Sequence, residues 1–358
     1  MNNYTAMSLF SGMGGDSLGM QNAGCTIIAY NELKPIYCKT HDLNFPFSKC
    51  IYHKNIYDIS KLDDIYFETY KNKIDILFAG FPCQGFSNAG KKKEDDPRNT
   101  MFREFLRVCN IIKPSMIIGE NVKGLLKKKT KNGEYYIDII ISEFQSLNYD
   151  IEYKILNTAQ YNVPQTRERL IIIGILKNNK YNWIPSFPEP CKIIPNVSNI
   201  ISYDMTGAVR VDSNIFRDIP NECILENMED ETIYNDNNNG HPYLLRKLNT
   251  DRKTYNGITY ESLFSFAKRK SPIHCEIIDI RKPSKTIICT YEHQPRLFVP
   301  LKNKNGYFLR ALLADELKQI QGFPKEYKIN GSLKDKIIQI GNAVPPPLIE
   351  CVIKHIIE

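Results

Sequence analysis

The sequence predicts an α/β protein built on a mostly parallel β-sheet with helices on both faces, plus a smaller, loop-rich domain. Three observations lead to this prediction. Short apolar runs alternate with amphipathic stretches through the first half of the 358 residues, the alternation stops near residue 178, and regular elements return after about residue 275. We therefore expect a first domain at 1–178, a second at 179–275, and a return to the first at 276–358.

Six apolar runs of strand length and five helical patterns support the sheet. The apolar residues between 101 and 112 and between 137 and 147 recur at helical spacing, whereas the strand candidates are short and bounded by turn residues. The predicted strands are 6–10, 26–30, 74–79, 115–118, 151–156 and 170–176, and further helices are predicted at 314–321, 333–340 and 347–357.

The middle of the chain has a different composition. Proline becomes frequent from Pro185 to Pro195, and a polar cluster follows at 235–240. Tyrosine, phenylalanine, leucine and isoleucine persist through this stretch, so it is not a linker. We interpret it as a folded domain with many loops.

Composition excludes several classes of protein. A hydrophobic share of 42% with 24% charged residues suits a globular core and argues against a disordered or coiled-coil chain. The best apolar run, 170–176, is far shorter than the roughly 20 residues that cross a membrane. No basic segment precedes the first apolar stretch, so we expect no secretory signal.

Charge and cysteine usage suggest a cytoplasmic protein without metal. The net charge of +7 permits a polyanionic partner, although solubility alone would also explain it. The ten cysteines never form a Cys-x-x-Cys pair, so neither a zinc site nor a disulfide framework is expected.

A glycine-rich turn follows the first predicted strand. It contains Gly12, Gly14 and Gly15, and glycines there let the backbone approach a ligand closely. Glu32 ends the second strand, where a carboxylate can accept from ribose hydroxyls, and Asp58 could accept from an adenine amino group. The alternative that this turn has a purely structural role remains open. The spacing is not Gly-x-Gly-x-x-Gly, which favours an adenosine cofactor without a pyrophosphate.

A cysteine follows the strand 74–79 in the run Gly-Phe-Pro-Cys-Gln-Gly-Phe-Ser. Parallel sheets bind ligands in a crevice beyond the carboxyl ends of their strands, so we expect Cys83 to lie in that crevice. Most cysteines are buried and inert, but this position and its flanking Pro82 favour a nucleophile.

An acid and two arginines are expected beside that cysteine. Glu120 ends the next strand and can pair with the thiol as an acid, although a solvated loop glutamate is the plainer alternative. Arg167 and Arg169 alternate before the strand at 170, so both should point to one face and could bind a carbonyl, a phosphate or Glu120.

Taken together, these motifs resemble the cytosine-C5 DNA methyltransferases, which implies a Rossmann-like sheet and a separate target-recognition domain. The similarity covers nearly all residues outside 180–275 and follows the order of the family. The similar segments are Phe10–Gly15, Gly80–Gln84, Glu120–Val122, Gln165–Arg169, Arg281–Ile287, Gln321–Pro324 and Gly341–Pro347.

The resemblance implies methyl transfer from S-adenosyl-L-methionine to C5 of a cytosine that is rotated out of duplex DNA. Cys83 would add to C6, Glu120 would bind N3 and the exocyclic amine, and Pro82 would contact that amine through its carbonyl oxygen. Arg167 would orient Glu120 or hold O2, with Arg169 in support. The implied cofactor residues are Phe10, Ser11, Gly12, Gly14, Gly15, Glu32, Asp58, Ile59 and Asn342.

Double-stranded DNA is the expected partner, in a sequence-specific system of the restriction–modification type with a possible separate endonuclease. We expect a monomer. The candidate DNA contacts are polar or basic residues of the loop after Cys83 and of the second domain, many of them to phosphates. They are Gln84, Ser87, Lys91, Lys92, Lys93, Arg246, Lys247, Arg252, Lys253, Lys268, Arg269 and Lys270.

Three other functions remain open at this point. The same chemistry could act on tRNA, although the sequence around Cys83 and the sizeable insert favour DNA. A catalytically silent DNA-binding protein would not need Cys83, Glu120 and both arginines. A nicotinamide oxidoreductase would need the missing glycine spacing and leaves the cysteine without a role.

Overall fold

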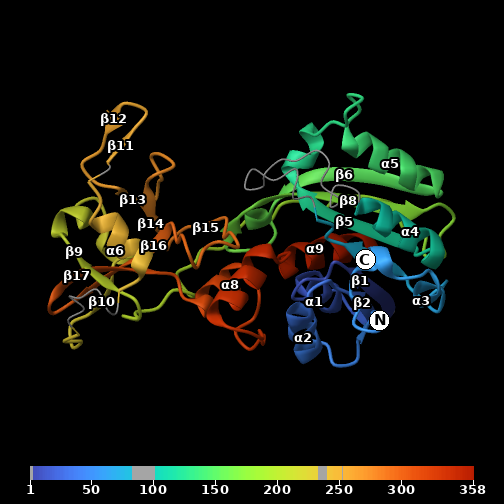
Figure 1. Ribbon diagram of the computed structural model, residues 1–358, viewed down its shortest axis with the longest axis horizontal. Coiled ribbons are helices and arrows are strands. Elements are labelled where there is room, and N and C mark those ends of the chain that lie inside the picture. Colours follow the sequence, from blue (N-terminus) through green and yellow to red (C-terminus); the bar gives the residue numbers. More distant parts are fainter. Residues whose placement is uncertain (1–2, 83–100, 233–239, 252) are drawn as a thin grey trace.

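A seven-stranded sheet forms the larger lobe of the computed structural model, which describes residues 3–82, 101–232, 240–251 and 253–358 (Figure 1). The strand order is β3-β2-β1-β4-β5-β8-β6. All neighbouring pairs are parallel except those of β8, which runs antiparallel to both β5 and β6. The strands are β1 Tyr4–Leu9, β2 Cys25–Asn31, β3 Lys49–Cys50, β4 Ile76–Ala79, β5 Met116–Val122, β6 Tyr149–Asn157 and β8 Glu168–Leu176.

Helices cover both faces of this sheet, as the sequence predicts. Side chains alternate across a strand, so Phe78 and Ile118 lie on one face while Leu77 and Ile117 lie on the other. The apolar cluster on the first face includes residues of α1 Gly15–Asn22, α7 Ala314–Ile320, α8 Leu333–Asn342 and α9 Pro346–Ile357. The second packs against α3 Ile65–Glu68, α4 Phe102–Ile112 and α5 Tyr136–Ser146, while α2 Pro35–Asn44 lies against the end of β2.

The second lobe is a smaller sheet of short strands, to the left in Figure 1. The order is β13-β14-β16-β17-β9, and β10 pairs with β16. Its strands are β9 Val209–Val211, β10 Leu225–Asn227, β13 Phe264–Phe266, β14 Cys275–Ile277, β16 Leu297–Asn303 and β17 Gly306–Ala311, joined by α6 Pro242–Leu248 and the hairpin of β11 Thr254–Tyr255 and β12 Ile258–Thr259.

The second sheet extends beyond the expected boundary at residue 275. Its two longest strands, β16 and β17, fall within the range that we expected to return to the first domain. The sequence predicted no strands here, and the partners of β16 and β17 include β9 and β10, which lie far away in the sequence. The residues that return to the larger lobe include β15 (Ser284–Lys285), which pairs with β7 (Gln165–Thr166), the adjoining Ile287, and the chain from α7 onward.

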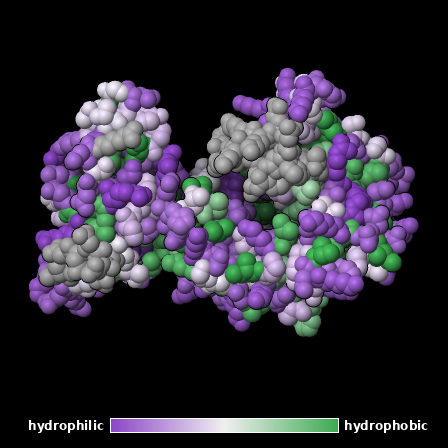
Figure 2. Space-filling model, in the orientation of Figure 1, coloured by the Kyte–Doolittle hydropathy of each residue, from purple (hydrophilic) through white to green (hydrophobic). Residues whose placement is uncertain are grey.

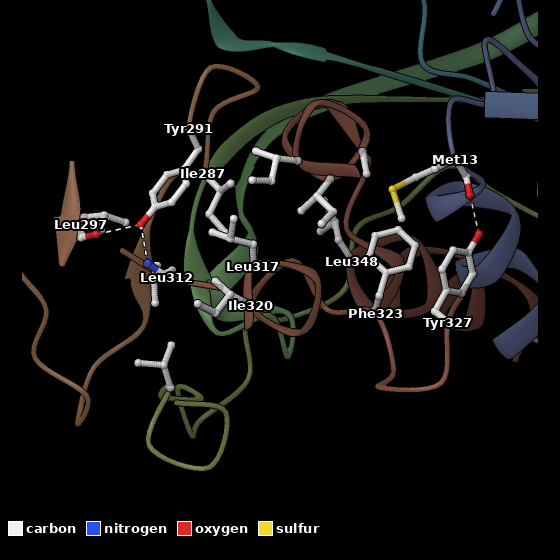
Figure 3. Close-up of a cluster of buried hydrophobic side chains, with 14 of the residues drawn as sticks. Met13, Ile287, Tyr291, Leu297, Leu312, Leu317, Ile320, Phe323, Tyr327 and Leu348 are labelled. Carbon is white, nitrogen blue, oxygen red and sulfur yellow. Dashed lines mark hydrogen bonds between the residues drawn. The ribbon is translucent and has the colours of Figure 1, made fainter. Parts of the chain in front are cut away.

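A continuous apolar cluster joins the lobes (Figure 3). Tyr291 accepts from the amide of Leu312 at 3.0 Å and donates to the carbonyl of Leu297 on β16 at 2.7 Å. At the other end of the cluster, Tyr327 donates to the carbonyl of Met13 in the glycine-rich turn. The C-terminal helices thus connect the turn after β1 to the second lobe.

A buried ion pair strengthens this junction. Arg310 of β17 is fully buried, pairs with Glu316 of α7 at 2.7 Å, and donates to the backbone carbonyls of Ser202 and Asp204. Within the described ranges, no helix is long and apolar enough to cross a membrane.

Candidate active site

The turn after β1 has the backbone of a ligand-binding loop. Phe10, Gly12 and Gly14 all have positive φ, at +55°, +57° and +88°. A Cβ on Gly12 would meet no atom within 4 Å, whereas a Cβ on Gly15 would lie 2.1 Å from the carbonyl oxygen of Val344. The loop is therefore open on the side of Gly12 and pressed against the C-terminal segment on the side of Gly15.

Glu32 is held beside this loop by two backbone amides. Its Oε2 accepts from the amide of Gly12 and its Oε1 from that of Lys34, both at 2.9 Å. Burial raises the pKa of the Glu32 carboxyl, and these two hydrogen bonds oppose the rise. Each carboxylate oxygen can accept more than one hydrogen bond, so Glu32 can still accept from a ribose hydroxyl.

Asp58 and Ile59 lie next to the end of β2. The side-chain amide of Asn31 donates to the carbonyls of Ile51 and Tyr57, which ties the segment before Asp58 to the end of β2. Asp58 itself caps a short 3₁₀ helix by accepting from the amide of Ser60, and Ile59 is buried. The expected contact of Asp58 with adenine stays a prediction.

These residues fit an adenosyl ligand. The hydroxyl of Ser11 is buried and has no hydrogen-bond partner among the described residues, next to the open side of Gly12. A buried hydroxyl without a partner is costly unless a ligand or water satisfies it. Ser11 and Glu32 could therefore hold the polar groups of such a ligand.

The ends of β4 and β5 lie side by side. Ala79 pairs with Gly119, so Gly80 and Glu120 are adjacent, and a Cβ on Gly80 would lie 3.9 Å from Oε2 of Glu120. The side-chain amide of Asn121 donates to the carbonyl of Phe81 at 3.0 Å and so ties the two strand ends together. Sequence reasoning assigned no role to Asn121, which only the pairing of β4 with β5 reveals.

Pro82 is half-buried and is the last described residue before the expected nucleophile. Cys83 and the predicted DNA contacts Gln84, Ser87, Lys91, Lys92 and Lys93 lie outside the described residues, as does Arg252. The other catalytic and cofactor candidates lie within them.

Arg169 forms the ion pair with Glu120. Its Nε lies 2.7 Å from Oε1 of Glu120, and each side chain is only 13% exposed. Burial lowers the pKa of the Arg169 guanidinium, and Glu120 opposes that shift. A partly buried guanidinium beside a carboxylate fixes the orientation of the acid.

Arg167 is placed elsewhere, so the expectation that it orients Glu120 is wrong, whereas its alternative role of holding O2 of the base stays a prediction. Its Nη1 donates to the carbonyls of Ile287 and Gly341, both at 3.1 Å, and burial strongly lowers its pKa. The register explains the difference. Glu120 lies opposite Ile171, so Arg169 is its diagonal neighbour two residues away, whereas Arg167 lies four residues away.

The C-terminal segment is bound to this region by a glutamine pair. Gln165 donates to Gln321 and accepts from the amide of Ile287, and Gln321 donates to the carbonyl of Ala343. Asn342, expected near the methionine end of the cofactor, is exposed at the last residue of α8. Both glutamines belong to motifs noted in the sequence. The sequence does not show that they bind each other, because they lie 156 residues apart.

Asp16 is a further polar residue of the site that sequence reasoning did not single out. It is 1% exposed in the first turn of α1 and accepts from the hydroxyl of Ser8 on β1. Burial raises the pKa of its carboxyl to about 7, and Glu120 contributes to that rise. Its position directly after the glycine-rich turn is the sequence feature that could have identified Asp16 as a candidate.

A family model described as C-5 cytosine-specific DNA methylase matches residues 4–358. The chain belongs to this family. It is 31% identical to a type II methyltransferase, M1.HphI of Haemophilus parahaemolyticus, over 99% of this chain and 87% of that protein. It is also 31% identical to M.FnuDI of Fusobacterium nucleatum, over 98% and 94%.

Solved structures agree on the fold. A putative DNA modification methyltransferase from an Escherichia coli prophage matches with a TM-score of 0.62 at 22% identity, over 98% of each chain. A DNMT2 mutant of Spodoptera frugiperda matches with a TM-score of 0.65 at 18% identity, over 97% of this chain and 98% of that one. The protein is thus a DNA cytosine-5 methyltransferase of the restriction–modification type that uses S-adenosyl-L-methionine.

The methyltransferase has a basic pocket near the junction of its lobes, and Figure 2 shows a hollow between them. The pocket has a volume of about 460 Å³, and its lining includes Arg269, Lys285 and Arg296. Lys285 pairs with the buried Glu276 at 2.5 Å, whereas Arg269 is exposed. Of the other predicted DNA contacts, Arg246, Lys268 and Lys270 are exposed, while Lys247 and Lys253 are half-buried.

Proposed function

We propose that this methyltransferase modifies cytosine in duplex DNA through a covalent bond between Cys83 and C6 of a base rotated out of the helix. The observation that carries the proposal is the pairing of β4 with β5. It brings the end of the strand that leads to Cys83 against the strand that carries Glu120 and its ion pair with Arg169.

A thiolate at Cys83 adds to C6 of the ring, which makes C5 nucleophilic. Glu120 donates to N3 and binds the exocyclic amine as charge builds on the ring, and Arg169 holds the acid in place. The bound S-adenosyl-L-methionine supplies the methyl group to C5. Loss of the C5 proton then re-forms the double bond and releases the Cys83 thiolate.

Other residues position these groups. The carbonyl of Pro82 accepts from the exocyclic amine, and Asn121 fixes the backbone of Phe81 immediately before it. Arg167 braces the loop of Ile287 and Gly341, and holding O2 of the base remains its other proposed role. Glu32 and Ser11 hold the adenosyl part of the cofactor.

Duplex DNA lies in the hollow between the lobes, with the target base toward the ends of β4 and β5. The exposed arginines and lysines of the second lobe contact the DNA, and base recognition takes place there. We further propose a monomer in the cytoplasm, whose cognate endonuclease acts as a separate protein.

Replacing Cys83 by serine tests the mechanism. Cys83→Ser should keep binding to duplex DNA and to cofactor but lose incorporation of tritiated methyl groups. A serine variant with full activity would refute the covalent route. Parallel assays on duplex DNA and on tRNA test the substrate, and methylation of tRNA alone would overturn the proposal of DNA.

A further inference from the structure

Two cysteine thiols contact each other beside the proposed cofactor site. Sγ of Cys50 donates to Sγ of Cys38, and the two sulfurs lie 3.9 Å apart. Cys38 is buried in α2, whereas Cys50 ends β3 and is half-buried. A disulfide holds its two sulfurs at about 2.05 Å, so the pair must close by about 2 Å to form one.

The surroundings of the two thiols give them different reactivities. Cys38 donates to the backbone carbonyl of Glu32 at 3.4 Å. Contact with Cys38 lowers the pKa of the Cys50 thiol, and the same contact raises the pKa of Cys38. The thiolate is the reactive form of cysteine. Cys50 is thus the more acidic and the more accessible thiol, and Cys38 is the neighbour that can complete a disulfide.

Cys50 lies on the edge strand of the seven-stranded sheet. β3 has two residues and pairs with β2, where Tyr30 lies opposite Cys50. A short edge strand with few ladder hydrogen bonds shifts at a lower cost than a central strand. The backbone of Cys50 can therefore follow the closure that a disulfide requires.

Both thiols adjoin segments that we assign to the adenosyl ligand. The buried thiol donates to the carbonyl of Glu32. Cys50 is followed by the segment 51–57, which the side chain of Asn31 holds against the end of β2 and which leads to Asp58. Closure of the two sulfurs therefore removes a hydrogen bond from the backbone of Glu32 and moves the start of the segment before Asp58.

We infer that Cys38 and Cys50 form a reversible disulfide and that this modification weakens the binding of S-adenosyl-L-methionine. The inference rests on the proposed place of the cofactor beside Glu32. A peroxide is the oxidant, and it takes up the two electrons that the sulfurs lose.

The oxidation has two steps. The Cys50 thiolate attacks one oxygen of hydrogen peroxide, which forms a sulfenic acid and releases hydroxide, and a proton converts that hydroxide to water. The Cys38 thiol then attacks the sulfenic sulfur, and its proton leaves with the displaced hydroxyl as a second water. Two thiols and one peroxide thus give one disulfide and two waters, and an added dithiol reverses the reaction by exchange.

The test uses the full chain with Cys83→Ser, because peroxide also oxidises a catalytic thiolate. After treatment with hydrogen peroxide and alkylation of the remaining thiols, mass spectrometry without reduction should find the peptides of Cys38 and Cys50 joined. Calorimetry should show that cofactor affinity falls about fivefold or more, as for the loss of at least one hydrogen bond. Dithiothreitol should restore the affinity.

Single serine variants in the same background identify the thiols responsible. Cys50→Ser and Cys38→Ser should each keep their cofactor affinity after peroxide. Cys351→Ser is the matched control, because this thiol is also half-buried but burial raises its pKa to about 11. It should lose affinity as the parent protein does. Cys50→Ser alone decides the matter if the buried Cys38→Ser does not fold.

Three results would overturn the inference. They are the absence of the joined peptides, a disulfide that leaves cofactor affinity within about twofold of the reduced protein, and a loss of affinity that persists in Cys50→Ser. Failure of the proposed cofactor site looks different, because then Glu32→Ala would leave the affinity of the reduced protein unchanged.

Discussion

The two lobes hold their candidate functional residues in opposite ways. In the larger lobe, Glu32, Glu120 and Arg169 are mostly buried, and each has a partner at hydrogen-bond distance. In the second lobe, Arg246 and Arg269 are exposed. Groups that react must be held in a fixed geometry, whereas groups that contact a flexible polyanion need only be accessible.

Strand length follows the same division. The larger lobe contains strands of up to nine residues, in β6 and β8, whereas four of the six strands in the second sheet have three residues. The strands that carry the site, β4 and β5, are buried along most of their length, which fixes the positions of their ends. We therefore expect substitutions in the larger lobe to change chemistry or stability, and those in the second lobe to change DNA binding.

The largest effect should come from Arg169→Ala. The substitution leaves Glu120 without its cation and without a fixed orientation, so we expect methyl transfer to fall about 10²–10⁴-fold. Cofactor binding, measured by calorimetry, should change little. Arg169→Lys keeps the charge but not the shape of the guanidinium and should be intermediate. Activity of the alanine variant within about twofold of native would contradict the assigned role.

Gly15→Ala should destabilise the larger lobe. Its Cβ would lie 2.1 Å from the backbone oxygen of Val344, so the C-terminal segment must move away from the loop, at a cost of about 1–3 kcal/mol or more. Gly257→Ala, in the hairpin of the second lobe, adds a Cβ with no atom within 4 Å. It should lose only the stability that the strained positive φ costs. Chemical denaturation measures both, and equal losses would argue against the packing described here.

The pH dependence of stability should reveal Asp16. Its folded pKa of about 7 lies above the ordinary 3.8, so the folded state binds a proton that the unfolded state releases. That contribution to stability is present below about pH 4 and is lost as pH rises to 7. His41, with a pKa of about 3, contributes the opposite slope between pH 6.5 and 3.

Asp16→Asn isolates the first of these slopes. The unfolding free energy of the native protein minus that of the variant should fall by about 1.4 kcal/mol per pH unit between pH 4 and 7. Denaturant titrations at several pH values provide the measurement. A difference that stays constant with pH would show that folding does not raise the pKa of Asp16.

Arg269→Ala should have the smallest effect. We expect DNA binding to weaken several-fold and its salt slope to decrease by about 1, because one phosphate contact is lost. Cofactor affinity should not change. Lys304→Ala, an exposed lysine paired with Glu231, is the matched control in the same lobe. An unchanged salt slope for Arg269→Ala would show that Arg269 does not contact a DNA phosphate.

The sequence predicts the larger lobe well because its elements are periodic and bounded by glycine and proline. All six predicted strands and the predicted helices are present. Contacts between distant segments could not be predicted. The pairing of β16 and β17 with the second sheet, the bond of Gln165 to Gln321, and the choice of Arg169 over Arg167 all depend on register.

The covalent bond to the target base is the most direct test of the account. Duplex DNA that carries 5-fluorocytosine at the target site should stop the reaction after addition, because no C5 proton can leave. Mass spectrometry of the digested product should then find one DNA strand attached to the peptide that contains Cys83. Methyl transfer to native duplex DNA without such a conjugate, or a conjugate at another residue, would contradict it.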